Sequence, residues 1–435
     1  MEVQSLLKNN LYPSVLIVAH EVINKTTSVG KTLYQYFSNW PVDKISELYF
    51  HSEIPTTHTC ERYYRITDFD MLKSVIPFRN TGTIFEKEDI DENLVSARVD
   101  VGTEKLIYQA GSKKKPWMFT CRNLLWRLNT WKNRKLDSWI EEVKPEVIFF
   151  PTSDYTFPYE IVEYISKKFN IPVVTCVFDD YYYSAINKNT FLNKLNIHFL
   201  HKKIKCCMDN SSFILYNQPK MQRLYQKDFG KVPNDVFFMS TAISNAKEKD
   251  NNPIIISYFG SLGLGRHEAI FDIGNILKEI TPDANIFIDV YSAESDANVL
   301  SLLVPENRIR FRGSISAKEV EEVVLNSNVL LLPESFNDRY LGRIEYALST
   351  KVPDYLGSNR CILAYGPEAA GSIGYLKESG LDSVAVNIDD LKAILIKLIE
   401  DSGFRREMAQ KQIELAKKNH SSKVNHEVLL KALST

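Results

Sequence analysis

The chain has 435 residues, of which 44% are hydrophobic and 25% charged, and its formal net charge at pH 7 is −1. This length predicts two or three domains, while the balanced composition excludes an intrinsically disordered chain and a strongly basic nucleic-acid-binding protein. No apolar run approaches the roughly 18–20 residues that span a bilayer, and the first residues do not resemble a signal peptide. The six cysteines lack zinc-like spacing, so a reducing cytoplasm is the expected location.

The N-terminal half alternates short apolar strands with helical stretches, which is the pattern of an α/β protein. Residues 15–19 predict a first buried strand, residues 28–39 a helix, and residues 45–50 a second strand. Residues 52–118 are less regular and predict an insertion, and one long helix is expected over 120–143. Further strands are predicted at 147–150, 173–178 and 213–216.

The C-terminal half begins after the polar segment 244–252, the best domain boundary in the chain. A helix is expected over 267–279 and a charged helical tail over 389–433, and strands are predicted at 254–259, 284–290, 308–311, 329–332, 361–365 and 383–386. We therefore predict two Rossmann-like α/β domains that face each other across a cleft holding the site. The predicted parts are 1–243, 244–410 and a tail over 411–435.

The most informative motif is the segment 349–367, STKVPDYLGSNRCILAYGP. It places Ser349, Thr350, Lys351 and Asp354 at the start of a predicted helix, with Tyr355 after the carboxylate. A helix start offers unpaired backbone N–H groups and the positive end of a dipole, which suits a phosphate. Because a carboxylate can accept hydrogen bonds from sugar hydroxyls, the segment predicts a nucleotide-sugar site.

A glycine-rich turn follows the first predicted strand of the C-terminal half. Gly260, Ser261 and Gly263 would let the backbone approach a pyrophosphate, and Arg266 can neutralise it. A dinucleotide fingerprint would also need glycine at position 268, where Glu268 stands. A plain tight turn therefore remains an equal alternative.

Two familiar motifs are present only in part. The sequence around Gly30 resembles a phosphate-binding P-loop, but that loop would need glycine where Lys25 stands, so Gly30 is expected instead to let the chain pass close to a donor. Asp68 and Asp70 form a D-x-D triplet of the kind that holds a divalent ion. Such triplets also arise by chance, and the histidines lack metal-ligand spacing, so no metal site is predicted.

Acidic residues follow two of the predicted buried strands. Asp179 and Asp180 come directly after the strand at 173–178, and Glu334 follows the strand at 329–332. Open α/β sheets place their chemistry at the carboxyl ends of strands, so these carboxylates are candidates to contact a sugar or an acceptor. The alternative is that they only cap a helix or close a turn.

Positive charge is concentrated in residues 101–140, which hold nine Lys and Arg against two Asp and Glu. Lys114, Trp117, Arg122, Trp126 and Arg127 mix basic and tryptophan side chains, a combination that favours a membrane interface or a lipid-linked acceptor. The alternative is a helix that packs its tryptophans into the core and leaves its charges in solvent.

Taken together, these motifs resemble the retaining, two-Rossmann-domain (GT-B) glycosyltransferases of the family 4-like type that build bacterial surface polysaccharides. Segment 349–367 is similar to the family's most specific block, and the turn at Gly260 is similar to its strand-turn-helix. By this resemblance Arg266 corresponds to the diphosphate-binding lysine, and Glu334 and Asp354 correspond to an acidic pair whose second member holds the ribose. Gly30 corresponds to the family's N-terminal glycine loop.

The chain also departs from the family pattern. Ser261 stands where the family has a second cation, which Lys351 is expected to replace. The acidic pair is separated by 19 residues instead of seven, which predicts an inserted loop over 337–348. Asp179 and Asp180 stand where the family has a histidine.

The resemblance implies that a sugar is transferred from a UDP- or GDP-linked donor to a glycan hydroxyl, without a metal or another cofactor and with retention of configuration. It implies a hexosyl- or N-acetylhexosaminyl-transferase of capsule, O-antigen or exopolysaccharide synthesis. The N-terminal domain would bind an acceptor on polyprenyl diphosphate, and the protein would lie on the inner face of the cell membrane. Two alternatives stay open: a nucleotide-sugar epimerase of the same fold, and a non-catalytic partner subunit of a transferase.

Overall fold

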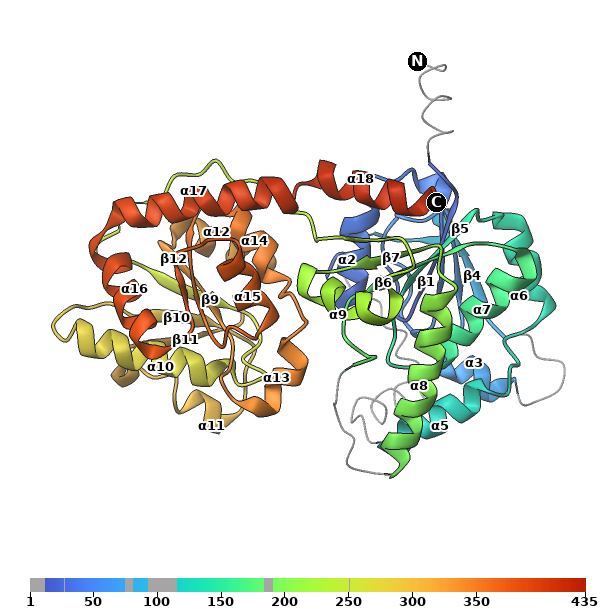
Figure 1. Cartoon of the computed structure of the whole chain (residues 1–435), viewed down its shortest axis with the longest axis horizontal. Coiled ribbons are helices and arrows are strands. Elements are labelled where there is room, and N and C mark those ends of the chain that lie inside the picture. Colours follow the sequence, from blue (N-terminus) through green and yellow to red (C-terminus); the bar gives the residue numbers. More distant parts are fainter. Residues whose placement is uncertain (1–11, 27, 75–80, 93–115, 184–190, 250) are drawn as a thin grey trace, which may run out of the picture. The chain divides into compact units, whose positions relative to one another are not determined.

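The computed structural model describes residues 12–26, 28–74, 81–92, 116–183, 191–249 and 251–435 (Figure 1). It divides the chain into two compact units. Unit 1 comprises Met1–Asn217, Gln222–Phe237 and His426–Thr435, and unit 2 comprises Gln218–Met221 and Phe238–Asn425. The division falls six residues before the expected boundary at 243, and the last ten residues belong to unit 1 instead of a separate tail.

Unit 1 is built on an eight-stranded sheet with the order β4-β3-β2-β1-β5-β6-β7-β8, in which every neighbouring pair is parallel except β3 and β4. Its strands are β1 (Val15–Ala19), β2 (Ile45–Tyr49), β3 (Arg62–Arg65), β4 (Thr83–Glu86), β5 (Val147–Pro151), β6 (Val173–Val177), β7 (Phe213–Tyr216) and β8 (Asn234–Val236). Its helices are α2 (Ser28–Phe37), α3 (Asp68–Lys73), α5 (Pro116–Trp126), α6 (Arg134–Val143), α7 (Phe157–Phe169), α8 (Phe191–Asp209) and most of α9 (Pro219–Phe229). The central strands are buried along their whole length because helices cover a parallel sheet on both faces.

The structure corrects two expectations in this half. The expected insertion over 52–118 does not have only elements of its own, because β3 and β4 extend the main sheet beside β2, and its residues 75–80 and 93–115 lie outside the described residues. The expected long helix over 120–143 is two helices, α5 and α6. Asn129 adopts a positive φ of 56° between them, and the Asn133 side chain caps the start of α6 by accepting a hydrogen bond from the backbone N–H of Leu136 at 3.0 Å.

Unit 2 is built on a six-stranded, all-parallel sheet with the order β11-β10-β9-β12-β13-β14. Its strands are β9 (Ile256–Phe259), β10 (Ile288–Tyr291), β11 (Ile309–Gly313), β12 (Val329–Pro333), β13 (Cys361–Tyr365) and β14 (Val384–Ala385). Counted from its own first strand, this order is 3-2-1-4-5-6, the order of a dinucleotide-binding Rossmann sheet. Strands 1, 4 and 5 supply a core of Ile, Leu, Val and Tyr side chains with almost no exposed surface.

The helices of unit 2 surround this sheet (Figure 1). They are α10 (Arg266–Ile280), α11 (Ala297–Leu300), α12 (Ala317–Asn326), α13 (Asp338–Ile344), α14 (Lys351–Gly357), α15 (Gly371–Glu378), α16 (Ile388–Glu400) and α17 (Ser402–Asn419), and α18 (Ser422–Leu433) runs from unit 2 into unit 1. The segment expected as an inserted loop over 337–348 contains α13, whose first turn is capped by the Asn337 side chain. In the described part of the chain, no helix has the length and apolar character that crossing a bilayer requires.

The polar segment 244–252 is held against unit 2 rather than free. Arg360 is 1% exposed and donates hydrogen bonds to the backbone carbonyls of Ala246, Lys247 and Leu325 at 2.9, 3.2 and 2.8 Å. A buried guanidinium has five donors to satisfy, and these carbonyls satisfy three of them. The segment is therefore part of the packing of unit 2.

Candidate functional site

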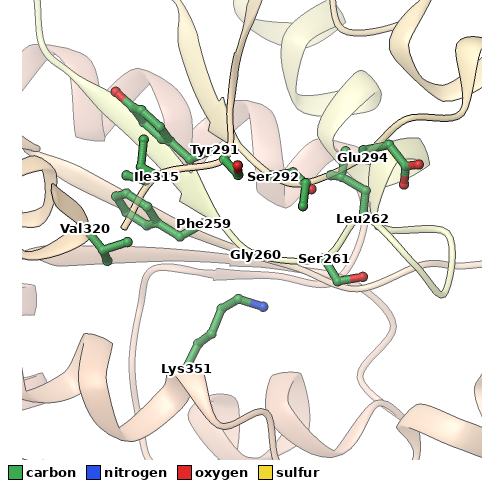
Figure 2. Close-up of a pocket in the computed structure, with 12 residues that line it drawn as sticks. Phe259, Gly260, Ser261, Leu262, Tyr291, Ser292, Glu294, Ile315, Val320 and Lys351 are labelled. Carbon is green, nitrogen blue, oxygen red and sulfur yellow. The ribbon is translucent and has the colours of Figure 1, made fainter. Parts of the chain in front are cut away.

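The candidate site of unit 2 lies where the strand order of its sheet reverses. The order runs outward from β9 in one direction and from β12 in the other, so the loops that follow these two strands diverge and leave a crevice at the carboxyl edge. Gly260 and Ser261 follow β9, and Glu334 follows β12. Lys351, the first residue of α14, reaches the same loops, and Figure 2 shows its amino group pointing toward Gly260 and Ser261.

Gly260 is required for this approach. Its φ of +115° disfavours any side chain, and a Cβ built on it would lie 2.6 Å from Lys351 Cε and 2.9 Å from Lys351 Nζ. The Lys351 amino group also lies 5.3 Å from the centre of the Tyr258 ring. The glycine thus lets a cation sit directly against the backbone of the turn after β9.

A second cation, Arg266, is positioned by a buried carboxylate. Arg266 begins α10, and its Nη2 donates to Glu334 Oε1 at 3.2 Å. Glu334 is only 3% exposed, and its Oε2 is buried without a hydrogen-bond partner among the described residues. A buried oxygen without a hydrogen bond lowers the stability of the protein. A ligand hydroxyl or N–H that donates to this oxygen would remove that cost, so Glu334 Oε2 is a candidate acceptor for a ligand.

The electrostatics of the site favour an anion. Burial, and secondly the positive charge of Arg266, lower the pKa of Lys351 to about 8, against a smaller opposing effect of Glu334. Burial is also the largest single effect on Arg266 and opposes its charge, but Glu334 and Tyr258 together outweigh burial and raise the pKa of that guanidinium. Two cations held near one carboxylate leave a positive charge that a bound diphosphate would neutralise.

A pocket of about 470 Å³ opens beside Lys351 and Gly260, and Figure 2 shows the side chains around it. The rings of Phe259 and Tyr291 stack in it, with centres 5.3 Å apart and planes 13° from parallel. Its remaining surface comes from Ser261, Leu262, Ser292, Ala293, Glu294, Ser314, Ile315 and Val320. A flat apolar surface with hydroxyl, carboxylate and backbone groups around it can hold the base and ribose of a nucleotide.

The structure brings together only some of the predicted donor residues. Gly260, Ser261, Lys351, Arg266 and Glu334 converge, as described above. Ser349 and Thr350 precede α14, and the backbone N–H of Ser349 donates to Ser372 Oγ at 2.9 Å. The backbone N–H of Gly263 donates to Ser261 Oγ at 3.1 Å, which shapes the turn.

Two further predicted donor residues lie elsewhere on α14. Asp354 is on the exposed side of the first turn and does not line the pocket. Tyr355 is buried in the core, and its ring centre lies 6.5 Å from that of Phe259. The role of Asp354 as the ribose ligand therefore remains a prediction.

In unit 1, the predicted acidic residues after β6 have local partners. Asp180 Oδ1 accepts hydrogen bonds from the backbone N–H groups of Tyr182 and Tyr183 and from the Tyr225 hydroxyl, at 3.2, 2.8 and 2.8 Å. Asp179 Oδ2 accepts from the Tyr181 hydroxyl at 3.2 Å. This is how an acidic residue closes a turn, which was the alternative interpretation.

Gly30 is also required by local packing. A Cβ at this position would lie 2.1 Å from Asn24 Nδ2 and 2.4 Å from the carbonyl oxygen of Val22. The backbone N–H of Asn24 donates to the carbonyl of Gly30 at 3.3 Å, which closes the loop between β1 and α2.

Two members of the basic and tryptophan-rich segment have structural partners inside unit 1. Trp126 is fully buried, and its Nε1 donates to Asp68 Oδ1 at 2.7 Å. Arg122 donates from Nε to the same oxygen at 2.9 Å and lies 2.8 Å from His20 Nε2 through Nη1. An indole N–H and a guanidinium can be buried once they share a carboxylate, so these two side chains pack inward.

The remaining members of that segment differ in placement. Arg127 is exposed, Lys114 lies outside the described residues, and Trp117 is in α5 with its side chain outside the described part.

Asp70 caps α3 by accepting from the backbone N–H and the hydroxyl of Thr67, both at 2.9 Å. Both acids of the D-x-D triplet thus have structural partners, and within the described ranges no group of three His, Cys, Asp or Glu side chains is arranged to hold a metal ion.

One cluster in unit 1 was missed by the sequence interpretation. The sheet of unit 1 also reverses its order, between β1 and β5, and His20 and Tyr155 follow these strands. Their rings stack with centres 5.5 Å apart, and the Arg122 guanidinium lies 4.3 Å from the centre of the Tyr155 ring. The signal was available, because His20 and Tyr155 both lie just beyond buried strands, the same rule that selected Asp179 and Glu334.

Comparison with known proteins rests on structure alone. The sequence matches no protein-family model and no curated protein. The structure is similar to sucrose-phosphate synthase from Thermosynechococcus elongatus, with 10% identity over 95% of this chain and 97% of that one and a TM-score of 0.59. It is also similar to Anabaena HepE in complex with UDP, with 10% identity over 97% and 99% of the two chains and a TM-score of 0.60.

A third similar structure is the UDP-forming α,α-trehalose-phosphate synthase from Burkholderia xenovorans in complex with glucose-6-phosphate, with 10% identity over 97% of this chain and all of that one and a TM-score of 0.58. At such low identity these matches describe architecture only. They extend over nearly the whole of both chains, so they concern both sheets and not one widespread motif. The chain therefore has the two-Rossmann-domain fold of the GT-B glycosyltransferases.

Proposed function

We propose that the protein is a glycosyltransferase that binds a nucleotide-sugar donor in the pocket of unit 2. The observation that carries this proposal is the convergence of Lys351 and Arg266 on the turn after β9, beside a pocket large enough for a nucleoside. Similar structures have been solved with UDP and with UDP-glucose, both as complexes of HepE. These complexes make a UDP-linked sugar the first donor to test.

In this proposal the diphosphate binds between Gly260, Lys351 and Arg266. When the bond between the sugar and the diphosphate breaks, negative charge develops on the departing phosphate. Cations and backbone N–H groups that are already in place stabilise this charge without rearranging, which is often the largest contribution to catalysis. Glu334 holds Arg266 in position, and its unsatisfied Oε2 would accept a hydrogen bond from the ligand.

The finer features of the proposal rest on the resemblance of segment 349–367. They are a family 4-like enzyme, transfer of a hexose or N-acetylhexosamine with retention, metal independence, and an acceptor on polyprenyl diphosphate for capsule, O-antigen or exopolysaccharide synthesis at the inner membrane face. In a retaining front-face route the leaving phosphate takes the proton of the acceptor hydroxyl. The cluster of His20, Arg122 and Tyr155 in unit 1 is the group of side chains we assign to the acceptor.

A non-catalytic partner subunit is the alternative that one observation favours, because Ser261 stands where a second cation is expected. Lys351 argues against this alternative, because its amino group lies beside Gly260, where the second cation would contact the diphosphate. An epimerase would bind the same donor but would return it by elimination and re-addition as a nucleotide-sugar with one inverted centre, and it would need no acceptor.

Turnover of a panel of UDP- and GDP-sugars by the purified chain, in EDTA, separates these possibilities. We expect slow donor hydrolysis with release of the nucleoside diphosphate, and its loss in Lys351→Gln but not in Lys417→Gln, an exposed position on α17. Return of the donor as an epimerised nucleotide-sugar would support the epimerase instead. If no donor is bound or hydrolysed, the proposal is wrong.

A further inference from the structure

A surface of unit 1 combines exposed apolar side chains with unopposed basic residues, and we call it the α5–α8 surface. It consists of exposed side chains of α8, of the end of α5 and of the turn that follows α5: Leu124, Arg127, Leu128, Phe191, Lys194, Leu195 and Lys202. The helices pack on each other, because Asn196 Nδ2 donates to Thr120 Oγ1 at 2.9 Å and the Arg127 guanidinium lies 4.8 Å from the centre of the Phe199 ring. Figure 1 shows α5 and α8 side by side in unit 1.

The apolar part is unusually exposed for its residue types. Leu124 and Leu128 are 55% and 54% exposed, and Phe191 and Leu195 are 78% and 40% exposed. Phe191 and Leu195 are spaced four residues apart in α8, so they lie on the same face of that helix. Leu124 is in the last turn of α5, and Leu128 is in the turn that follows, where its backbone N–H donates to the carbonyl of Leu125 at 3.2 Å. Single exposed leucines are common on protein surfaces, but four large apolar side chains exposed on two packed helices and the turn after α5 would favour being covered.

The charge around this patch has one sign. Residues 116–135 contain five Lys and Arg, residues 191–208 contain four, and neither segment contains Asp or Glu. A groove of about 1030 Å³ runs beside the patch, and Arg127, Lys132 and Lys202 are among the residues that line it. Its two carboxylates are Glu160 and Glu163, which are already paired with Lys203 at 3.3 and 3.6 Å.

We propose that the α5–α8 surface docks the protein on a membrane containing anionic lipids. Leucine and phenylalanine would enter the boundary between headgroups and acyl chains, and the basic residues would contact headgroup phosphates. A protein partner fits less well, because the centres of protein interfaces are depleted in lysine. A small soluble anion would use the groove but would leave the apolar pairs in water.

This surface differs from the one that composition predicts, and only Arg127 belongs to both. Of the residues that composition predicts, Trp126 is fully buried and Arg122 is partly buried, and both donate to Asp68. The structure instead exposes Leu124 and Leu128, which lie two residues before and after Trp126. The proposal does not depend on the donor site, because membrane binding can be measured without nucleotide.

The test is flotation of the full chain with vesicles of phosphatidylcholine alone or of phosphatidylcholine and phosphatidylglycerol in equal parts. We expect binding to the anionic vesicles only, weakening as salt is raised. The double variant Leu124→Gln, Leu128→Gln should lose about tenfold or more in partitioning, and Arg127→Gln, Lys202→Gln should lose a similar factor together with most of the salt dependence.

Matched controls lie on unit 2. Ile396→Gln changes an apolar side chain that is 37% exposed, and Lys417→Gln, Lys418→Gln changes two exposed cations, so both should bind like the wild type. Unchanged melting temperatures establish that every variant is folded. The proposal is overturned if the wild type does not float with anionic vesicles, or if the controls lose as much as the α5–α8 variants. It is also overturned if the leucine variants abolish a dimer while vesicle binding is unchanged, because a second copy would then cover the patch.

Discussion

Lys351 is a cation that the protein buries next to another cation, and this arrangement explains why it should respond to an anion. Its position could be selected from the sequence, since it starts a helix beside a carboxylate and two hydroxyls. What the sequence did not reveal is the partner of its amino group. Gly260 lies 91 positions earlier in the chain, and the approach depends on the sheet order that places β9 beside β12.

The first prediction concerns the pH dependence of UDP binding. Only the protonated amine attracts the diphosphate, and burial with Arg266 lowers the pKa of Lys351 to about 8 in the free protein. Affinity should therefore be nearly constant below that pH and fall by up to about tenfold per pH unit above it. Calorimetric titrations from pH 7 to 9 measure this. Lys351→Gln should bind weakly with no such decline, and an equal decline in the variant would contradict the assignment.

The second prediction separates backbone strain from the contact with Lys351. Gly260→Ala and Gly380→Ala both place a side chain at positive φ, +115° and +77°, which costs about 1–3 kcal/mol of stability. A Cβ at Gly380 meets nothing within 4 Å, whereas one at Gly260 meets the Lys351 side chain. Both variants should unfold at lower urea concentration, but only Gly260→Ala should also weaken UDP binding, by about tenfold or more. Equal UDP affinities in the two variants would show that the contact is irrelevant.

His420 contributes to the stability of unit 2 through its burial and its two hydrogen bonds. It is fully buried at the end of α17, with Nδ1 2.9 Å from the carbonyl oxygen of Met239 and Nε2 2.9 Å from the Tyr375 hydroxyl. Scattered histidines had been considered only as metal ligands. Met239 and Tyr375 lie far from His420 in the chain, so the spacing of residues in the sequence does not predict these two contacts.

The third prediction follows from this burial, which lowers the pKa of His420 from 6.5 to about 4. The unfolded chain takes up a proton before the folded one, so the stability from this residue is complete above pH 6.5 and is lost as the pH falls toward 4. Urea unfolding should show about 2 kcal/mol less stability at pH 5 than at pH 7 from this group alone. His420→Gln should remove that part of the pH dependence, and an unchanged profile would refute it.

At the scale of elements, the strands buried along their whole length were predicted best, whereas the partly buried β3, β4 and β8 were missed. The runs at β1, β7 and β13 agree with the expected bounds because strands buried on both faces are continuously apolar. The predicted helix over 120–143 failed because its break depends on Asn129 and on the side-chain cap of Asn133, both polar residues that a helix also tolerates. Because a single helix was predicted, the sequence did not indicate that Trp126 is buried in the core.

The fourth prediction tests how α5 is held on α3. Asp68 accepts from both Arg122 and Trp126, so Asp68→Ala leaves a buried guanidinium and an indole N–H without their acceptor and should cost about 2–3 kcal/mol. Asp70→Ala removes only a helix cap and should cost about 1 kcal/mol. Chemical unfolding measures both. If added Mn²⁺ stabilises the wild type and not these variants, the D-x-D triplet binds metal and the structural interpretation is wrong.

At the scale of the whole molecule, the two units share one design. Each sheet reverses its strand order beside its first strand, between β1 and β5 in unit 1 and between β9 and β12 in unit 2, and each reversal gathers polar side chains. The α/β alternation predicted two such domains, and the structure confirms them. The exact division could not be predicted, because the chain returns to unit 1 through α18 and no local signal in a charged helix shows where it packs.

The central claim is that the crevice between β9 and β12 holds the diphosphate of a nucleotide sugar. A crystal structure of the full chain with UDP tests it most directly. We predict electron density for the base beside Phe259 and Tyr291 and for the diphosphate within hydrogen-bonding distance of Lys351 Nζ and Arg266. UDP bound elsewhere on the molecule, or density in this pocket that leaves both cations without a phosphate contact, would contradict the account.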